Sequence, residues 1–237
     1  MNVAAAHPTT VPAARRGPNA GFGRLEAIGV IRHLSPRESL VFEGDAADCF
    51  HRVLRGTIAT YKATADGRRQ IIAFFYPGDL VGFTAGERFA YGAEAIDRSS
   101  VCSVPRAKLG VLGDEEPALR EGLLSALRRE VEAAQERQLW LGRKTARERL
   151  ACFLLECAGR TGQAGPDGGL SVPLPMSQLE VADYLGLAPE TVSRTLAQLA
   201  RTGAIEVVPP FAGVVVRDRH AIEAAAGESA PLPGGSA

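Results

Sequence analysis

The sequence predicts an α+β chain in three parts: a β-sandwich or barrel, a long helix, and a C-terminal helix-turn-helix followed by a β-hairpin. Short runs of β-forming residues separated by turn signals extend from Leu25 to about Val111. A stretch rich in Ala, Leu, Glu and Arg follows from Glu115. Two short amphipathic segments joined at Gly186 then precede two valine-rich runs.

Composition narrows the class of protein. The 237 residues contain 27 Lys and Arg and 27 Asp and Glu, so a uniformly basic protein is excluded, although a local basic face is not. No apolar run approaches the roughly 20 residues needed to cross a bilayer, and the N-terminus lacks the apolar core of a signal peptide. We therefore expect a cytoplasmic protein without a membrane partner. The Ala-, Pro- and Gly-biased ends, 1–21 and 227–237, are expected to be a flexible arm and tail.

The cysteines do not form a metal-binding pattern. Cys49, Cys102, Cys152 and Cys157 include no CxxC pair, and no histidine stands at zinc-ligand spacing beside them. We expect reduced and mostly buried thiols, with no metal or cofactor.

The N-terminal region, expected to be one domain over 22–113, carries a hairpin signal. Asp66-Gly67 lies between two alternating segments, which is typical of a tight β-turn. Regular punctuation of short strands favours a sandwich or barrel.

The next segment, 114–142, has the spacing of a coiled coil. Apolar and small residues recur at alternating steps of three and four: Leu124, Leu127, Val131, Ala134, Gln138 and Leu141. About 25 residues span ~37 Å, more than a small β domain can cover, so the stripe is predicted to pair with a second copy of the chain. The alternative is that it packs on the protein's own β domain.

The C-terminal domain is expected over 143–226. It opens with a helix, "TARERLACFLLECAGR", whose Leu150, Phe153, Leu154 and Cys157 share one face. Ser177 and Glu180 then form a capping-box pattern at the start of a further helix.

Two short helices around Gly186 fit a helix-turn-helix. Pro189 suits the first turn of the second helix. The apolar positions expected to pack are Leu179, Val181, Ala182, Leu185, Leu187, Val192, Leu196 and Leu199. Helical spacing then places Glu190, Ser193, Arg194 and Gln198 on the free face. In a major groove, Arg can read guanine, Glu can accept from cytosine N4, and Ser can contact a base or a phosphate.

The competing interpretation is a solvated helix in which Glu190 and Arg194 form an i, i+4 ion pair. The segments "GAIEVV" and "GVVVRD" weigh against it, because a hairpin directly after two helices makes a winged helix. Arg217, Arg219 and His220 near the wing could contact phosphates. The candidate DNA-binding residues are Ser177, Glu190, Thr191, Ser193, Arg194, Gln198 and Arg201, the last as a phosphate contact.

From about Phe22 to Ala226 the chain resembles the CRP/FNR superfamily of bacterial transcription regulators. "FYPGDLVGF" is similar to the family's β-roll turn, and "VADYLGLAPETVSRTLAQL" to the FNR/FixK recognition signature. The resemblance implies a cyclic-nucleotide-binding-like jelly-roll sensor, a dimerisation helix and a winged helix-turn-helix. It assigns Glu190, Ser193 and Arg194 to TTGA half-sites, since the cyclic-AMP branch has an Arg where this chain has Pro189.

Members of this superfamily sense their signals in different ways, and each way requires particular residues that can be sought in this sequence. A cyclic-nucleotide pocket would need Glu, Arg and Ser where this sequence has Phe83, Phe89 and Ala90; "DRSS" at 97–100 belongs to the following strand. Cys102 matches the central iron–sulfur cysteine of the FNR branch, but the N-terminal arm has no cysteine. His33 and His51 are interpreted as ordinary histidines rather than haem ligands.

The sequence therefore predicts a FixK-like, homodimeric, sequence-specific DNA-binding regulator that acts on palindromic TTGA-type operators in low-oxygen or redox-related gene control. Double-stranded DNA and RNA polymerase are its expected partners, and upstream signalling that sets its amount is its expected input. The alternative is an effector-gated CRP-like regulator whose β-roll binds a small molecule. An enzyme is not expected, because no nucleophile–base pair, metal-ligand spacing or phosphate loop is present.

Overall fold

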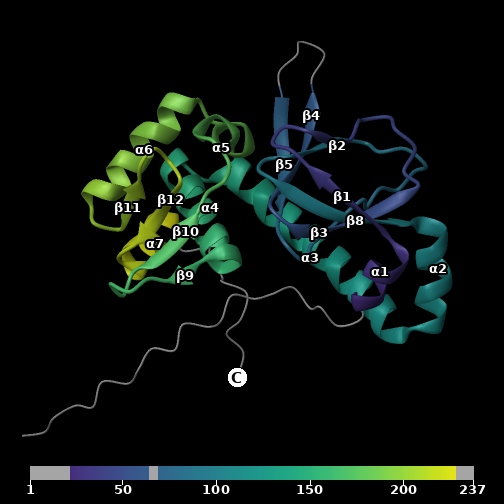
Figure 1. Ribbon diagram of the computed structural model, residues 1–237. Helices are drawn as coiled ribbons and strands as arrows, with labels where there is room; N and C mark the ends of the chain where they lie inside the picture. Colours follow the sequence, from purple (N-terminus) through teal and green to yellow (C-terminus); the bar gives the residue numbers. More distant parts are fainter. Residues whose placement is uncertain (1–21, 64–68, 228–237) are drawn as a thin grey trace, which may run out of the picture.

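The computed structural model describes residues 22–63 and 69–227 of the chain (Figure 1). The predicted arm 1–21, the Asp66-Gly67 turn and residues 228–237 of the predicted tail lie outside the described residues.

Two four-stranded antiparallel sheets form the N-terminal β-roll. One has the order β1 (Val30–Leu34), β8 (Ser99–Pro105), β3 (Cys49–Arg55) and β6 (Leu80–Val81). The other has the order β2 (Ser39–Val41), β7 (Gly92–Ala95), β4 (Ile58–Ala63) and β5 (Arg69–Phe75). Strands β4 and β5 pair up to Ala63 and Arg69, as expected of the arms of the predicted hairpin. Buried apolar residues of both sheets, among them Leu34, Val53 and Ile58, share one core.

Helices cover one end of the β-roll, and two of them were not expected from the sequence. The short helix α1 (Gly23–Ile28) and helix α2 (Arg106–Glu115) bury Leu25 and Leu109 in a cluster with Leu119 of the long helix α3 (Pro117–Arg143). The long helix therefore begins at Pro117 rather than at residue 114. The reason is the extended backbone of Glu116, which separates α2 from α3.

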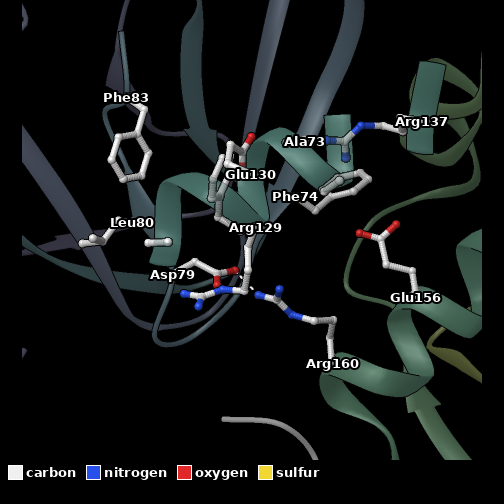
Figure 2. A pocket seen from close by; sticks show the side chains of 13 residues that line it. Ala73, Phe74, Asp79, Leu80, Phe83, Arg129, Glu130, Arg137, Glu156 and Arg160 are labelled. Atoms are coloured by element: carbon white, nitrogen blue, oxygen red, sulfur yellow. Dashed lines mark hydrogen bonds and ion pairs between the residues drawn. The ribbon is translucent and has the colours of Figure 1, made fainter. Parts of the chain in front are cut away.

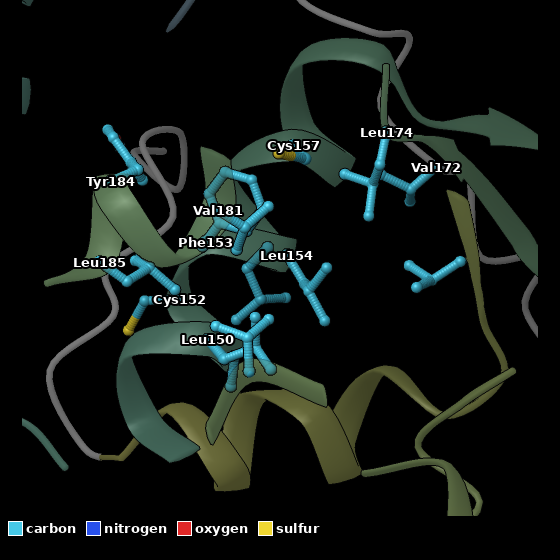
Figure 3. Packing of buried hydrophobic residues seen from close by; sticks show 14 of the residues in the cluster. Leu150, Cys152, Phe153, Leu154, Cys157, Val172, Leu174, Val181, Tyr184 and Leu185 are labelled. Atoms are coloured by element: carbon cyan, nitrogen blue, oxygen red, sulfur yellow. The ribbon is translucent and has the colours of Figure 1, made fainter. Parts of the chain in front are cut away.

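The C-terminal domain combines four helices with a small sheet. Its elements are α4 (Ala146–Thr161), β9 (Gln163–Ala164), β10 (Leu170–Pro173), α5 (Gln178–Leu185), α6 (Pro189–Arg201), β11 (Ile205–Val208), β12 (Gly213–Val216) and α7 (Arg219–Ala226). The sheet order is β11-β12-β10-β9. The predicted face of α4, with Leu150, Phe153, Leu154 and Cys157, is buried at the centre (Figure 3).

The β-roll and the C-terminal domain touch along β5 and α5. The ring of Tyr184 lies 5.1 Å from Phe74 and 5.5 Å from Phe153, centre to centre, so an aromatic cluster bridges the two domains. Gln70 donates a hydrogen bond to the backbone carbonyl of Asp183. Helix α5 accordingly lies on the side of its domain that faces β5 (Figure 1).

Candidate nucleic-acid interface

Helix α5 begins and ends as the sequence predicts. The Ser177 hydroxyl accepts from the Glu180 backbone N–H at 3.3 Å, and a Glu180 carboxylate oxygen accepts from the Ser177 N–H at 2.7 Å, which completes a capping box. Gly186 ends the helix in the left-handed conformation, with φ 61° and ψ 44°, which glycine adopts without a steric penalty. The expectation that Leu179 belongs to the core is wrong: Leu179 is 54% exposed, although α5 as a whole contacts α4, α6 and β5.

Helix α6 divides into a buried and an exposed face. Pro189 occupies its first turn. Val192, Leu196 and Leu199 are buried, and Thr195 joins them by donating its hydroxyl to the Thr191 carbonyl at 2.7 Å. The side chains on the other face lie exposed in one row: Glu190, Ser193, Arg194, Gln198 and Arg201. Among the remaining candidates, Thr191 is half-buried and Ser177 is exposed at the start of α5.

The competing ion pair is not formed. Within residues 22–63 and 69–227, neither Glu190 nor Arg194 lies in a salt bridge. The guanidinium of Arg194 therefore remains available to an external acceptor, as a base-reading residue requires.

The wing follows α6 as predicted, but its arginines are engaged. Strands β11 and β12 pair from Ile205–Val216 to Val208–Gly213. Arg217 donates two hydrogen bonds to one carboxylate oxygen of Glu206, at 2.6 and 3.0 Å, and Arg219 pairs with Glu223 at 2.7 Å. Only His220 of the three expected phosphate contacts is fully exposed. Contact with a phosphate would require Arg217 or Arg219 to leave its carboxylate.

The stripe along α3 is exposed. Leu124, Leu127, Val131 and Leu141 are 43%, 40%, 48% and 41% exposed, and Ala134 and Gln138 between them are exposed as well. A different face of α3 carries the buried Leu119 and Trp140. The stripe therefore does not pack on the protein's own β-roll, and it presents a heptad-spaced apolar surface.

Comparison with known proteins agrees with this arrangement. A Crp-like helix-turn-helix domain matches residues 148–225, and a cyclic nucleotide-binding domain matches residues 31–115. The nitrogen fixation regulation protein FixK of Bradyrhizobium diazoefficiens is 38% identical over 87% of this chain and 86% of its own. The chain belongs to the CRP/FNR family of transcription regulators.

Further relatives place this CRP/FNR regulator in the FixK-like branch, as predicted. The FixK protein of Azorhizobium caulinodans is 41% identical over 78% of this chain and 75% of its own. The structure of FixK2 from Bradyrhizobium japonicum superimposes with a TM-score of 0.78, at 35% identity, over 86% of this chain and 100% of that one. The predicted fold and the predicted DNA-binding regulatory function are therefore confirmed.

At the positions that the resemblance assigns to cyclic-nucleotide ligands, this CRP/FNR regulator has two phenylalanines and an alanine. Phe89 is buried in the core, and Phe83 packs edge-on against Phe50 with 5.2 Å between ring centres. Ala90 is exposed and has no polar side chain. None of the three offers the carboxylate, guanidinium or hydroxyl that ribose and cyclic phosphate require. In "DRSS", Ser99 and Ser100 are buried in β8, as expected.

The cysteines are distributed between the two domains. Cys102 is fully buried in β8 and donates to the Leu25 carbonyl, whereas Cys152 and Cys157 lie in the core of the C-terminal domain. Burial raises the pKa of each of these three thiols. Cys49, in β3, is half-buried. In the described ranges, no three His, Cys, Asp or Glu side chains gather as metal ligands, and no helix is long and apolar enough to cross a bilayer.

The two histidines considered as haem ligands differ. His33 is exposed on β1. His51 is buried, and its Nδ1 lies 2.9 Å from the Ser103 hydroxyl oxygen. Burial, together with the positive charges of Arg32 and Arg106, lowers the pKa of His51 to about 4.

Sequence reasoning missed the polar junction between the β-roll, α3 and α4. Arg137 of α3 donates to the Tyr184 hydroxyl at 2.6 Å, and that hydroxyl donates to Glu156 of α4 at 3.1 Å. Arg160 of α4 pairs with Asp79 of the β-roll beside a cavity of about 50 Å³ (Figure 2). Helical spacing could identify these residues as amphipathic, but not as neighbours across domains.

Proposed function

We propose that the protein is a homodimer that binds palindromic TTGA-type operators and activates transcription. The observation that carries this proposal is the exposed polar row on α6, opposite a buried face of Val192, Leu196, Leu199 and Thr195, with Arg194 free of any carboxylate in the described part of the chain. Ser177, Glu190, Thr191, Ser193, Gln198 and Arg201 complete the proposed interface.

The proposed role of each interface residue follows from its position along α5 or α6. The first turns of a recognition helix enter the major groove, so Glu190, Ser193 and Arg194 are proposed to contact base edges. Arg201, in the last turn of α6, lies where a phosphate contact is expected. Ser177, at the N-terminus of α5, is likewise placed for a backbone contact.

Dimerisation is proposed through the six-residue stripe on α3, residues 124, 127, 131, 134, 138 and 141. Its support is the exposure of four large apolar side chains at heptad spacing, since a second copy would bury them. The functional units are then the β-roll with α2, the paired α3 helices, and the winged helix-turn-helix from α4 to α7.

Activation is proposed because relatives carry the names "Transcriptional activator protein FnrA" and "Transcriptional activator protein anr". RNA polymerase is the corresponding protein partner, and the cytoplasm, where the operator lies, the corresponding location. FixK relatives are named for nitrogen fixation regulation, which supports low-oxygen gene control as the setting. We propose neither a catalytic activity nor a cyclic-nucleotide effector.

The test compares two arginines on one helix. Arg194→Ala should cost about 1–3 kcal/mol per half-site and relax the preference at the guanine position. Arg201→Ala should weaken binding to all sequences alike and reduce the salt slope by about one. Each variant is titrated against operators carrying each of the four base pairs at that position. If Arg194→Ala prefers guanine as strongly as the parent does, α6 does not read the operator in this way.

A further inference from the structure

One guanidinium joins the end of α3 to the helix-turn-helix. Arg149, in the first turns of α4, donates from Nη2 to the Leu141 carbonyl at 2.8 Å and from Nε to the Lys144 carbonyl at 3.0 Å. Its Nη1 donates to the Leu185 carbonyl at 3.0 Å. The first two acceptors lie at the end of α3 and the third at the end of α5.

These backbone carbonyls lie at helix C-termini and need a hydrogen-bond donor from outside their helix. The last four carbonyls of a helix have no partner within it, and their partial negative charge favours a cation. Leu141 and Leu185 both fall in the last turns of their helices. Only Arg, with five donors in a planar fork, can reach three such acceptors at fixed angles; a Lys ammonium cannot.

The turn at Gly186 lies at the same place. A Cβ built on Gly186, the residue that ends α5, would lie 3.5 Å from a methyl carbon of Leu141 and 3.8 Å from Arg149 Nη1. Leu141 also belongs to the exposed α3 stripe. The end of the proposed dimer surface therefore lies beside the turn that precedes the recognition helix.

We propose that Arg149 is a positioning residue that fixes the recognition helix relative to the dimer helix and so sets which spacing between half-sites the dimer accepts. Only Lys144 and Thr145 connect α3 to α4 along the chain, so the orientation of the domain depends on contacts between side chains and backbone. Tyr184 supplies such contacts at one side of α5, through Phe74 and Arg137, and Arg149 supplies them at its C-terminal end. This inference rests on the proposed function, because spacing has meaning only for a dimer on a palindrome.

The geometry makes spacing a sensitive readout. Adding one base pair moves a half-site by about 3.4 Å and turns it by about 35° around the duplex. A rigid dimer should bind one spacing and lose affinity steeply for its neighbours. A dimer whose winged helix-turn-helix domains can rotate tolerates several spacings. It binds the best spacing more weakly, because the second domain has a lower effective concentration at its half-site.

The experiment measures affinity for operators whose spacer is varied by one and two base pairs. Arg149→Ala should reduce affinity at the optimal spacing about tenfold and flatten the profile to within about threefold, with single half-site binding unchanged. Arg149→Lys, which keeps the charge but not the fork, should fall between the two. Arg147→Ala is the matched control: Arg147 is exposed two residues away on α4, with no hydrogen bond or ion pair to the described part of the chain.

A second measurement does not depend on DNA. Spin labels at Ala197→Cys, on the exposed face of α6, in a Cys49→Ser background report the distance between the two recognition helices of the dimer. Arg149→Ala should broaden that distribution, and Arg147→Ala should not. Should Arg149→Ala fail to fold, Arg149→Lys takes its place in both assays.

The outcomes separate the two proposals. A sharp spacing profile and a narrow distance distribution in a folded Arg149→Ala dimer would overturn the positioning role. Equal loss of half-site and full-site binding, with a lower melting temperature, would also overturn it, because Arg149 would then only stabilise the domain. If the parent protein binds no palindrome at any spacing, the proposed function fails, while the distance measurement still decides the role of Arg149.

Discussion

Val131→Glu should convert the proposed dimer into monomers. Val131 lies in the middle of the α3 stripe and is 48% exposed in the single chain. Burying a whole valine side chain contributes about 1.5–3 kcal/mol, so covering the exposed half contributes about 1 kcal/mol per chain, or about 2 per symmetric dimer. In the variant this contribution is lost and two carboxylates face each other in the seam.

The charge term is larger than the packing term. Desolvating an unpaired carboxylate costs several kcal/mol, and the two-fold axis applies that cost twice. A total above about 4 kcal/mol raises the dimer dissociation constant by roughly a thousandfold or more. Operator binding should fall with it, because a monomer engages only one half-site.

Sedimentation velocity over a concentration series measures the effect. Leu139→Glu is the matched control, because Leu139 lies on the same helix, is 62% exposed and falls outside the heptad stripe. It should leave the dimer intact. A Val131→Glu protein that sediments as a dimer at the concentrations at which the parent is dimeric would refute the assignment of the seam.

Further predictions concern stability and capping. A histidine in the unfolded chain is protonated below about pH 6.5, whereas the pKa of folded His51 is about 4. The free energy of urea unfolding should therefore fall as the pH drops from about 6.5 to about 4, by up to about 3 kcal/mol. His51→Gln should flatten this pH profile, and an unchanged slope would contradict the assignment. Leu154→Ala, at a fully buried site in α4, should cost about 2–5 kcal/mol in the same assay, and a loss below about 1 kcal/mol would show that the core closes over the cavity. Ser177→Ala and Thr145→Ala each remove an N-cap and should each cost about 1 kcal/mol. Only Ser177→Ala should also weaken operator binding. If Ser177→Ala binds the operator as tightly as the parent protein does, Ser177 serves only as an N-cap.

The sequence predicted a feature correctly where all the interacting atoms lie within one short segment. The capping box of Ser177 and Glu180, the left-handed Gly186 and the division of α6 into two faces follow from spacings of three and four residues. The heptad stripe is equally local, and the structure leaves it exposed on α3. Family resemblance added the order of the domains, which the comparisons confirm.

Errors arose where local preference was weak and packing decided. Helix α2 has little amphipathic pattern, and it forms where Leu109 meets Leu119 and Leu25 in a cluster assembled from distant segments. Leu179 was expected to be buried because it is apolar, yet the arrangement of α5 between α4, α6 and β5 leaves it exposed.

The sequence by itself did not predict helix α7, but it determined helices α4, α5 and α6 and the two strands of the wing, and which side chains α6 presents. These depend on interactions between residues a few positions apart, and the chain encodes them directly. The tertiary structure alone decided which partners the charged residues take. Arg217 meets Glu206, Arg194 meets no carboxylate in the described chain, and Arg149 meets carbonyls of two helices. Such contacts depend on how separate elements dock, and residue spacing carries no information about that docking.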